Sequence, residues 1–235
     1  MTSQEKMGKA IALVKSFAPK YQVSLKKYSK LHKVIGWILS KLGNKTYMTD
    51  YATTIGQNTV IPDSMTPEVD PQVWKEILHE GRHAADSNHY GDVLFGVAYL
   101  FPQVLGILGV VCSLAAVIAV ALGATPWLLL GVVTCLLVAP LPAPLRAWAE
   151  VRAYTVTMAT DYWTNTIGDQ EKYIDWLVEI FTGPGYYKMW PFPEQVRTYF
   201  EAKLTEIKFG IPRDPYLFEC EKLCSEIKWY DRYSP

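Results

Sequence analysis

A long uncharged stretch constrains the fold of this chain more than any other feature. Residues 93–145 contain no Asp, Glu, Lys or Arg, although these four types make up 20% of the 235 residues. The stretch is too long for one core helix, so it raises the question of a membrane segment. Pro102 and the sequence GATP at 123–126 divide it, because proline interrupts a helix. We therefore expect two apolar helices, at 103–122 and 127–139.

The two arms of this helical hairpin differ in length. The first arm contains eleven Leu, Ile and Val residues, which favour membrane insertion by roughly 3–7 kcal/mol in total. The second arm rises to only about 20 Å, whereas the hydrocarbon core of a bilayer is roughly 30 Å thick. Residues 103–139 are accordingly predicted to contact membrane lipid. The alternative is a buried helix pair inside an oligomer or a larger fold.

The sequence LHEGRHAAD contains the pattern H-E-x-x-H. It follows Pro71, which favours the first turn of a helix, and we expect that helix to run to about Ala85. Residues four apart lie on the same helix face, so His79 and His83 can bind one metal ion. Glu80 lies beside them, where it can take a proton from an attacking water. The pattern predicts a hydrolytic site with Zn²⁺ as its cofactor.

A hydrolytic zinc site needs a third protein ligand, and two residues compete for this role. His89 completes the spacing H-E-x-x-H-x-x-x-x-x-H, which supplies three histidines in metzincins. Those proteins have glycine at the position of Asp86, where their helix ends in a sharp turn that aspartate adopts less readily. Glu150, in RAWAEVRAY, is the other candidate, because a glutamate from a second helix completes the ligand set of thermolysin-like enzymes.

Three further segments accompany HEGRH in a fixed order: TTIGQNTVIPD before it, and PLPAPLRAWAEVRAYTVT and FTGPGYYKMWPFPEQV after it. Together they resemble a group of bacterial and phage gluzincin-like proteins, and the match covers about a fifth of the chain. The apolar hairpin departs from the shorter members of that group. A loosely similar arrangement occurs in heat-shock membrane proteases of bacteria, in which two membrane helices separate H-E-x-x-H from the glutamate ligand.

The resemblance implies roles for individual residues. It assigns zinc binding to His79, His83 and Glu150. It makes Glu80 the general base, which takes a proton from water and later delivers it to the leaving amine. Tyr186, in the Y-x-x-M-W-P segment, either donates to the oxyanion or is a packing tyrosine. Many gluzincins place an aspartate four residues after the glutamate ligand, but this position is Tyr154 here, so either Tyr154 or Asp86 is expected to orient a histidine.

The predicted fold class is α+β, a mainly helical zincin-like fold with a small β-hairpin before the H-E-x-x-H helix and an inserted apolar helical hairpin. Thr, Tyr and Ile on either side of a Gly-Gln-Asn turn predict strands at 47–55 and 59–61. An extended peptide could add to the edge of the strand near 53–55. Proline and charge patterns predict four helices after the apolar stretch. The expected parts are 1–92 with the β-hairpin and H-E-x-x-H helix, 93–145 with the apolar hairpin, and 146–235 with the third metal ligand.

Charge is balanced over the chain, because Lys plus Arg and Asp plus Glu are 23 each. No net charge attracts nucleic acid, so no nucleic-acid partner is expected. Lysines do gather at 24–42, where apolar residues recur between them at helical spacing. Such a basic amphipathic helix either lies on an anionic membrane surface or covers a core with its apolar face.

Two functions are consistent with these patterns. The first is a membrane-associated zinc metallopeptidase that acts on a peptide or protein, located at a bacterial membrane. The alternative is a phage virion protein, or another structural protein on a zincin scaffold, with little or no peptidase activity. Such a protein would insert its hairpin into the host envelope during genome ejection, and its partners would be other virion proteins or further copies of itself.

Overall fold

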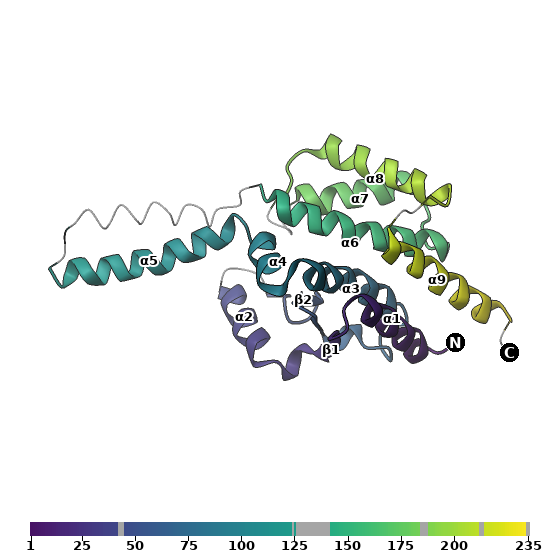
Figure 1. The fold of residues 1–235 in the computed structure, drawn as a ribbon, viewed down its shortest axis with the longest axis horizontal. Helices are drawn as coiled ribbons and strands as arrows, with labels where there is room; N and C mark the ends of the chain where they lie inside the picture. Colours follow the sequence, from purple (N-terminus) through teal and green to yellow (C-terminus); the bar gives the residue numbers. More distant parts are fainter. Residues whose placement is uncertain (42–44, 124, 126–141, 184–187, 212–213, 234–235) are drawn as a thin grey trace. The chain divides into compact units, whose positions relative to one another are not determined.

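The computed structural model describes the whole chain except residues 42–44, 124, 126–141, 184–187, 212–213 and 234–235. It is mostly helical and has one small mixed sheet, which confirms a mainly helical α+β architecture (Figure 1). The helices are α1 (Ser3–Phe17), α2 (Lys30–Lys41), α3 (Val73–Tyr90), α4 (Asp92–Tyr99), α5 (Gln103–Ala121), α6 (Pro144–Trp163), α7 (Gln170–Thr182), α8 (Pro193–Lys208) and α9 (Pro215–Tyr233). The strands are β1 (Gln22–Leu25), β2 (Thr53–Ile55) and β3 (Asn58–Ile61), and the short 3-10 turns are η1 (Lys26–Tyr28) and η2 (Asp63–Met65).

Two compact units make up the chain. Unit 1 comprises Met1–Phe95, Val151–Asp169 and Ala202–Pro235. Unit 2 comprises Gly96–Glu150 and Gln170–Glu201. Helix α6 is continuous across the point where the first segment of unit 2 ends and the second segment of unit 1 begins.

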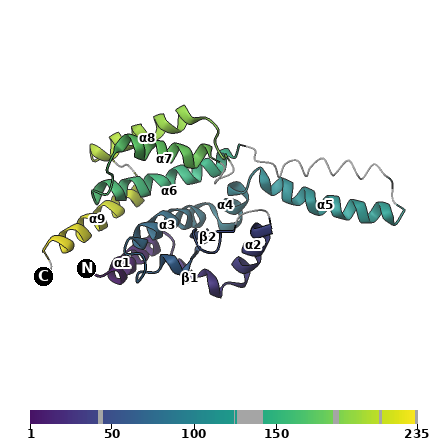
Figure 2. The same ribbon diagram turned by 180° about the vertical axis from the view of Figure 1, so that it is seen from behind.

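Helix α1 packs along α3 in unit 1, and both views of the ribbon show the two helices side by side (Figures 1 and 2). It begins with a capping box, in which the Thr2 hydroxyl accepts from the Glu5 N–H and the Glu5 carboxylate accepts from the Thr2 N–H. These bonds satisfy N–H groups that no helical carbonyl reaches. The buried face of α1 consists of Met7, Ala10 and Val14.

The three strands form a sheet in the order β1-β3-β2. The predicted hairpin is present as β2 and β3, which are antiparallel and joined at Gly56 with a φ of 60°. Its first strand is shorter than expected, because residues 47–50 form a turn and the strand begins only at Thr53. Strand β1 was not expected, and it pairs with β3 in parallel. A parallel partner needs a long connection, here through α2, so no turn signal beside β1 marks it in the sequence.

Helix α3 starts at Val73 rather than Pro71, and it continues to Tyr90 rather than ending near Ala85. It ends at Gly91, whose φ of 90° suits glycine and whose N–H donates to the Ser87 carbonyl. The expected end was wrong because nothing at Ala85 or Asp86 breaks the helix.

The apolar stretch begins with α4, which runs from the end of the first segment of unit 1 into unit 2, and continues with α5 in unit 2. Helix α5 matches the first predicted arm of the hairpin, whereas the second arm, 127–139, lies outside the described residues. Within the described part of the chain, Val104–Ala121 is the one stretch of helix long and apolar enough to cross a membrane. Only 18% of it is buried, so it differs from the core helix of a soluble protein.

The four helices expected after the apolar stretch are all present as α6, α7, α8 and α9. Helices α8 and α9 begin at Pro193 and Pro215, where the missing proline N–H costs no helical hydrogen bond. Helix α9 returns to unit 1, where its buried Cys220 and Cys224 are free thiols used as small apolar side chains.

The close approach of α1, α3 and α9 at Gly81 gives the first prediction. A Cβ at Gly81 would lie 2.2 Å from Val14 Cγ2 and 2.6 Å from the Tyr216 hydroxyl, which itself donates to the Leu78 carbonyl at 2.8 Å. Gly81→Ala should therefore lower the melting temperature by about 3–10 °C, measured by circular dichroism on the purified chain. Gly8→Ala is the control: its Cβ meets nothing within 4 Å, so it should stabilise by about 0.5–1 kcal/mol. Equal melting temperatures for Gly81→Ala and wild type would contradict this packing.

Candidate metal centre

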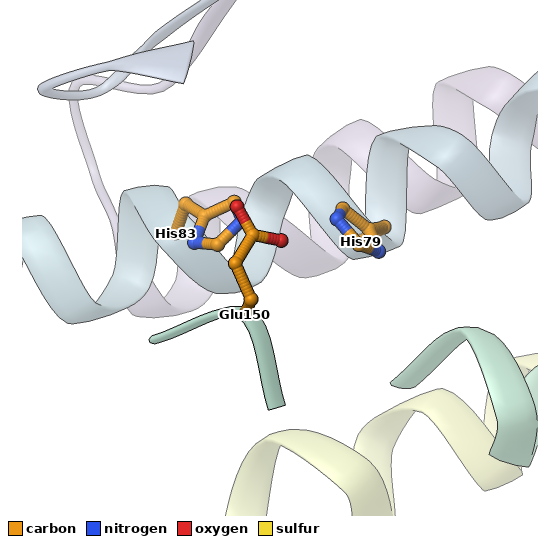
Figure 3. Close-up of side chains that lie close together, drawn as sticks. All are labelled: His79, His83 and Glu150. Atoms are coloured by element: carbon orange, nitrogen blue, oxygen red, sulfur yellow. The ribbon is translucent and has the colours of Figure 1, made fainter. Parts of the chain in front are cut away.

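His79 and His83 lie on the same face of α3, one turn apart, as the sequence predicts. Both side chains are buried. Their ring centroids are 5.4 Å apart, with the ring planes at 77° to one another. The pair therefore presents two imidazoles to one buried point beside α3 (Figure 3).

Helix α6 runs antiparallel to α3. Three side-chain contacts fix the register: Lys75 Nζ to Asp161 Oδ1 at 2.8 Å, His79 Nδ1 to Thr157 Oγ1 at 2.8 Å, and Arg152 Nη2 to Asp86 Oδ1 at 2.9 Å. As the residue numbers rise along α3, those of their partners fall along α6. Both ion pairs are largely removed from water, so their geometry constrains the two helices more than a surface pair would.

This register brings Glu150 to the histidines. The Tyr154 ring, one turn further along α6, packs edge-on against the His79 ring with centroids 4.7 Å apart. Glu150 is buried and its side chain extends from α6 towards α3 (Figure 3). The possible ligand atoms of His79, His83 and Glu150 all lie within 4.8 Å of one another.

The donor set fits a zinc ion. Zn–N and Zn–O bonds of about 2.1 Å place tetrahedral ligand atoms roughly 3.4 Å apart, so small rotations of the side chains would close the observed spacing onto an ion. Two imidazoles and one carboxylate are also the three-ligand set that leaves a fourth position for water. A buried carboxylate beside two imidazoles is costly by itself, and a cation between them compensates its charge.

Thr157 contacts His79, the first of the three candidate ligands. Its hydroxyl donates to the Ala153 carbonyl on its own helix, at 3.4 Å, and it lies 2.8 Å from His79 Nδ1. A hydroxyl that donates to the carbonyl accepts from Nδ1–H, and this tautomer leaves the Nε2 lone pair for a metal. Sequence reasoning expected Tyr154 or Asp86 in this role. The Tyr154 ring packs edge-on against the His79 ring, and the Asp86 carboxylate accepts from Arg82 and Arg152. The sequence feature that could have indicated Thr157 is its position three residues after Tyr154, which places both side chains on the same face of α6.

Tyr99 contacts Glu150, the carboxylate among the three candidate ligands. Its hydroxyl donates to Glu150 Oε1, and the Arg146 guanidinium lies over its ring at 5.1 Å from the centroid. Sequence reasoning missed Tyr99. The available signal was a phenol inside a stretch without charged residues, since a buried hydroxyl needs a polar partner.

Glu80 is buried on α3 beside the histidines. Its charge raises the pKa of Lys26, although burial has the larger effect and lowers that pKa to about 8. It also contributes to the raised pKa values of Tyr21 and Tyr47, which burial raises first. These groups lie next to β1 and in the segment before β2.

The remaining sequence candidates lie elsewhere. His89 is exposed near the end of α3 and its ring contacts Tyr90, because the helix continues through Asp86 without the turn that metzincins require. His89 instead borders a cavity of about 370 Å³ together with Asp86 and Arg152. Tyr186 lies outside the described residues.

The second prediction separates the two candidates for the third ligand. Glu150→Ala should reduce zinc retention sharply, because it removes the only carboxylate in the buried group, whereas His89→Ala should retain about one zinc per chain. Metal content after gel filtration, measured by plasma mass spectrometry, is the readout. Loss of zinc in His89→Ala with full retention in Glu150→Ala would exclude this site.

The third prediction tests the Thr157 hydroxyl. Thr157→Val keeps the shape of the side chain but removes the acceptor for His79 Nδ1–H, so zinc affinity should fall by about 10–100-fold in a chelator competition. Thr155→Val is the control on the same helix: Thr155 is buried, whereas Thr157 is half-buried, and the Thr155 hydroxyl donates to the Val151 carbonyl. If both variants bind zinc equally well, the hydroxyl has no orienting role.

Comparisons with known proteins add no name to this geometry. No family model matches the chain, and neither a curated protein nor a solved structure matches it. The resemblance to gluzincins therefore stays a prediction that rests on residues of the chain. What the structure brings together is a buried His79, His83 and Glu150 group that could hold a metal ion.

Proposed function

We propose that the chain is a membrane-associated zinc metallopeptidase of the gluzincin type. The observation that carries the proposal is the buried group of His79, His83 and Glu150, which comes from two antiparallel helices. Its ligand types and order along the chain are those of a zinc hydrolase with one open position. The hydrogen bond that His79 Nδ1–H donates to the Thr157 hydroxyl supports the same reading, since metal-binding histidines usually have such a partner.

Glu80 would act as the general base. When bound, zinc would supply a Lewis acid that polarises the scissile carbonyl and lowers the pKa of water. Glu80 would take the proton of the attacking water and return it to the leaving amine. Its place next to His79 on α3 and its burial support this role.

The sheet offers a place for an extended substrate. Strand β2 is at the edge of the sheet, since the order is β1-β3-β2, and α3 packs against both β2 and β3. Within the described residues, the free edge of β2 pairs with no other strand. A peptide could therefore add antiparallel or parallel to β2 through backbone hydrogen bonds, which would make recognition depend little on side chains.

Association with a membrane is the less specific part of the proposal. Helix α5 has the length and apolar composition of a span, and most of its side chains are exposed. An apolar helix that is neither buried nor in lipid would be a costly exposed surface. We therefore place residues 103–139 in a bacterial membrane.

A structural protein on the same scaffold is the second candidate. The observation that favours it is the electrostatic coupling of Glu80 to the buried Lys26, which gives Glu80 a stabilising role without catalysis. In the phage version, the chain would be a virion component whose partners are virion proteins or further copies, and its apolar helices would enter the host envelope. Zinc would then stabilise the fold.

The fourth prediction distinguishes these functions. Glu80→Gln keeps the side-chain shape and removes the base, so hydrolysis of casein or a peptide library should fall by about 10²–10⁴-fold while zinc content stays unchanged. Glu76→Gln, one turn earlier on α3, is the matched control and should keep its activity. Activity and zinc content are measured on the same preparations.

The structural alternative predicts another pattern for the same variants. If Glu80 mainly compensates Lys26, Glu80→Gln should lower the melting temperature, and wild type and variant should be equally inactive on every substrate. That outcome would remove the peptidase proposal and leave the zinc-stabilised scaffold.

A further inference from the structure

Helix α2 turns its apolar residues outward. Leu31, Val34, Trp37 and Ile38 are exposed, and Trp37 keeps 64% of its surface in contact with solvent. These positions recur at helical spacing, so they form one stripe along the helix. Of the two readings of this amphipathic segment, a helix that covers a core with its apolar side is thereby excluded.

The opposite side of α2 packs against the rest of unit 1. His32 is buried and its Nδ1 lies 2.7 Å from the Tyr47 hydroxyl. A Cβ at Gly36 would lie 2.7 Å from Met48 Cγ, so the segment 46–50 approaches the helix closely there. Polar and small residues thus attach α2 to the unit, and this attachment fixes the apolar stripe on the outside.

The charge around this stripe has one sign. Between Glu5 and Asp50 the chain contains ten lysines and no acidic residue, although its total charge is zero. Lys30, Lys33 and Lys41 of α2 are exposed and form no ion pair with any residue that the structure describes. By helical spacing they lie beside Val34 and Trp37. The apolar stripe and these lysines therefore lie on the same exposed face of α2.

We propose that this face of α2 binds the surface of an anionic lipid bilayer, with the helix parallel to the membrane plane. An apolar stripe with tryptophan and flanking lysines matches the boundary between acyl chains and anionic headgroups. A second copy of this chain fits poorly, because a symmetric contact between two α2 helices would bring their lysines together. The binding needs neither zinc nor the insertion of α5.

Fluorescence of the full-length chain tests this placement. The chain is mixed with vesicles that carry dibrominated acyl chains, made of phosphatidylcholine alone or with phosphatidylglycerol. Bromine quenches only tryptophans within a few ångströms, so the wild-type signal minus that of Trp37→Phe isolates Trp37. Trp229 on α9, which is 57% exposed, gives the matched control through Trp229→Phe.

The expected result is quenching of Trp37 in anionic vesicles, weaker quenching in neutral vesicles, and none for Trp229. Replacing Lys30, Lys33 and Lys41 by Gln should lower the binding constant of α2 for anionic vesicles by about fivefold per lysine. Salt at 1 M should have a similar effect, because it screens the attraction between the lysines and the headgroups. A zinc chelator should leave the quenching unchanged, so failure of the metal site and failure of this proposal remain distinguishable.

Three outcomes would overturn the proposal. Trp37 unquenched in both lipids would show that no bilayer covers α2. Equal quenching of Trp37 and Trp229 in both lipids would assign the contact to α5 and not to the basic helix. A shift from dimer to monomer on Leu31→Asp, with Trp37 unquenched, would make a second copy the occupant.

Discussion

The antiparallel packing of α3 on α6 is the interaction on which the candidate site depends. Two ion pairs, Lys75–Asp161 and Asp86–Arg152, lie on either side of the contact between His79 and Thr157. Helices fixed at two points along their length cannot slide by a turn without breaking both pairs, and breaking Lys75–Asp161 would leave two largely buried charges without each other. The position of Glu150 opposite the histidines is therefore a consequence of the register between α3 and α6. The same contacts that set this register also hold the candidate ligands in place.

Neighbouring hydroxyl groups support the residues of the candidate metal centre. The three ligand residues come from rigid helices, and a hydroxyl group supports one residue of each kind: Thr157 holds His79, and Tyr99 holds Glu150. Such support fixes the ring tautomer and the carboxylate rotamer before any metal binds, which reduces the entropic cost of binding. Glu80 is buried on the same helix, which packs against β2 and β3. Its coupling to Lys26 means that its catalytic and stabilising roles must be separated by measuring activity and stability together.

Two helices carry exposed apolar surface, and their chemistry differs. Helix α5 is apolar on all sides, as expected for hydrocarbon surroundings, whereas α2 combines an apolar stripe with lysines. The first kind of surface responds to the thickness of the acyl region, and the second to the charge of the headgroups. The proposed contact of α2 with lipid would therefore depend on headgroup charge independently of α5.

Local pattern determined the helices and the histidine pair. The spacing of His79 and His83 was enough to place them on one face, and prolines marked the first residues of α8 and α9. Tertiary structure decided those features that depend on contacts between residues far apart in the sequence. Strand β1 exists only through its pairing with β3. Glu150, and not His89, lies beside the histidine pair because α3 continues to Tyr90 and α6 docks in one register. The outward face of α2 was decided in the same way, because periodicity gives two faces to a helix and only packing chooses which of them is buried.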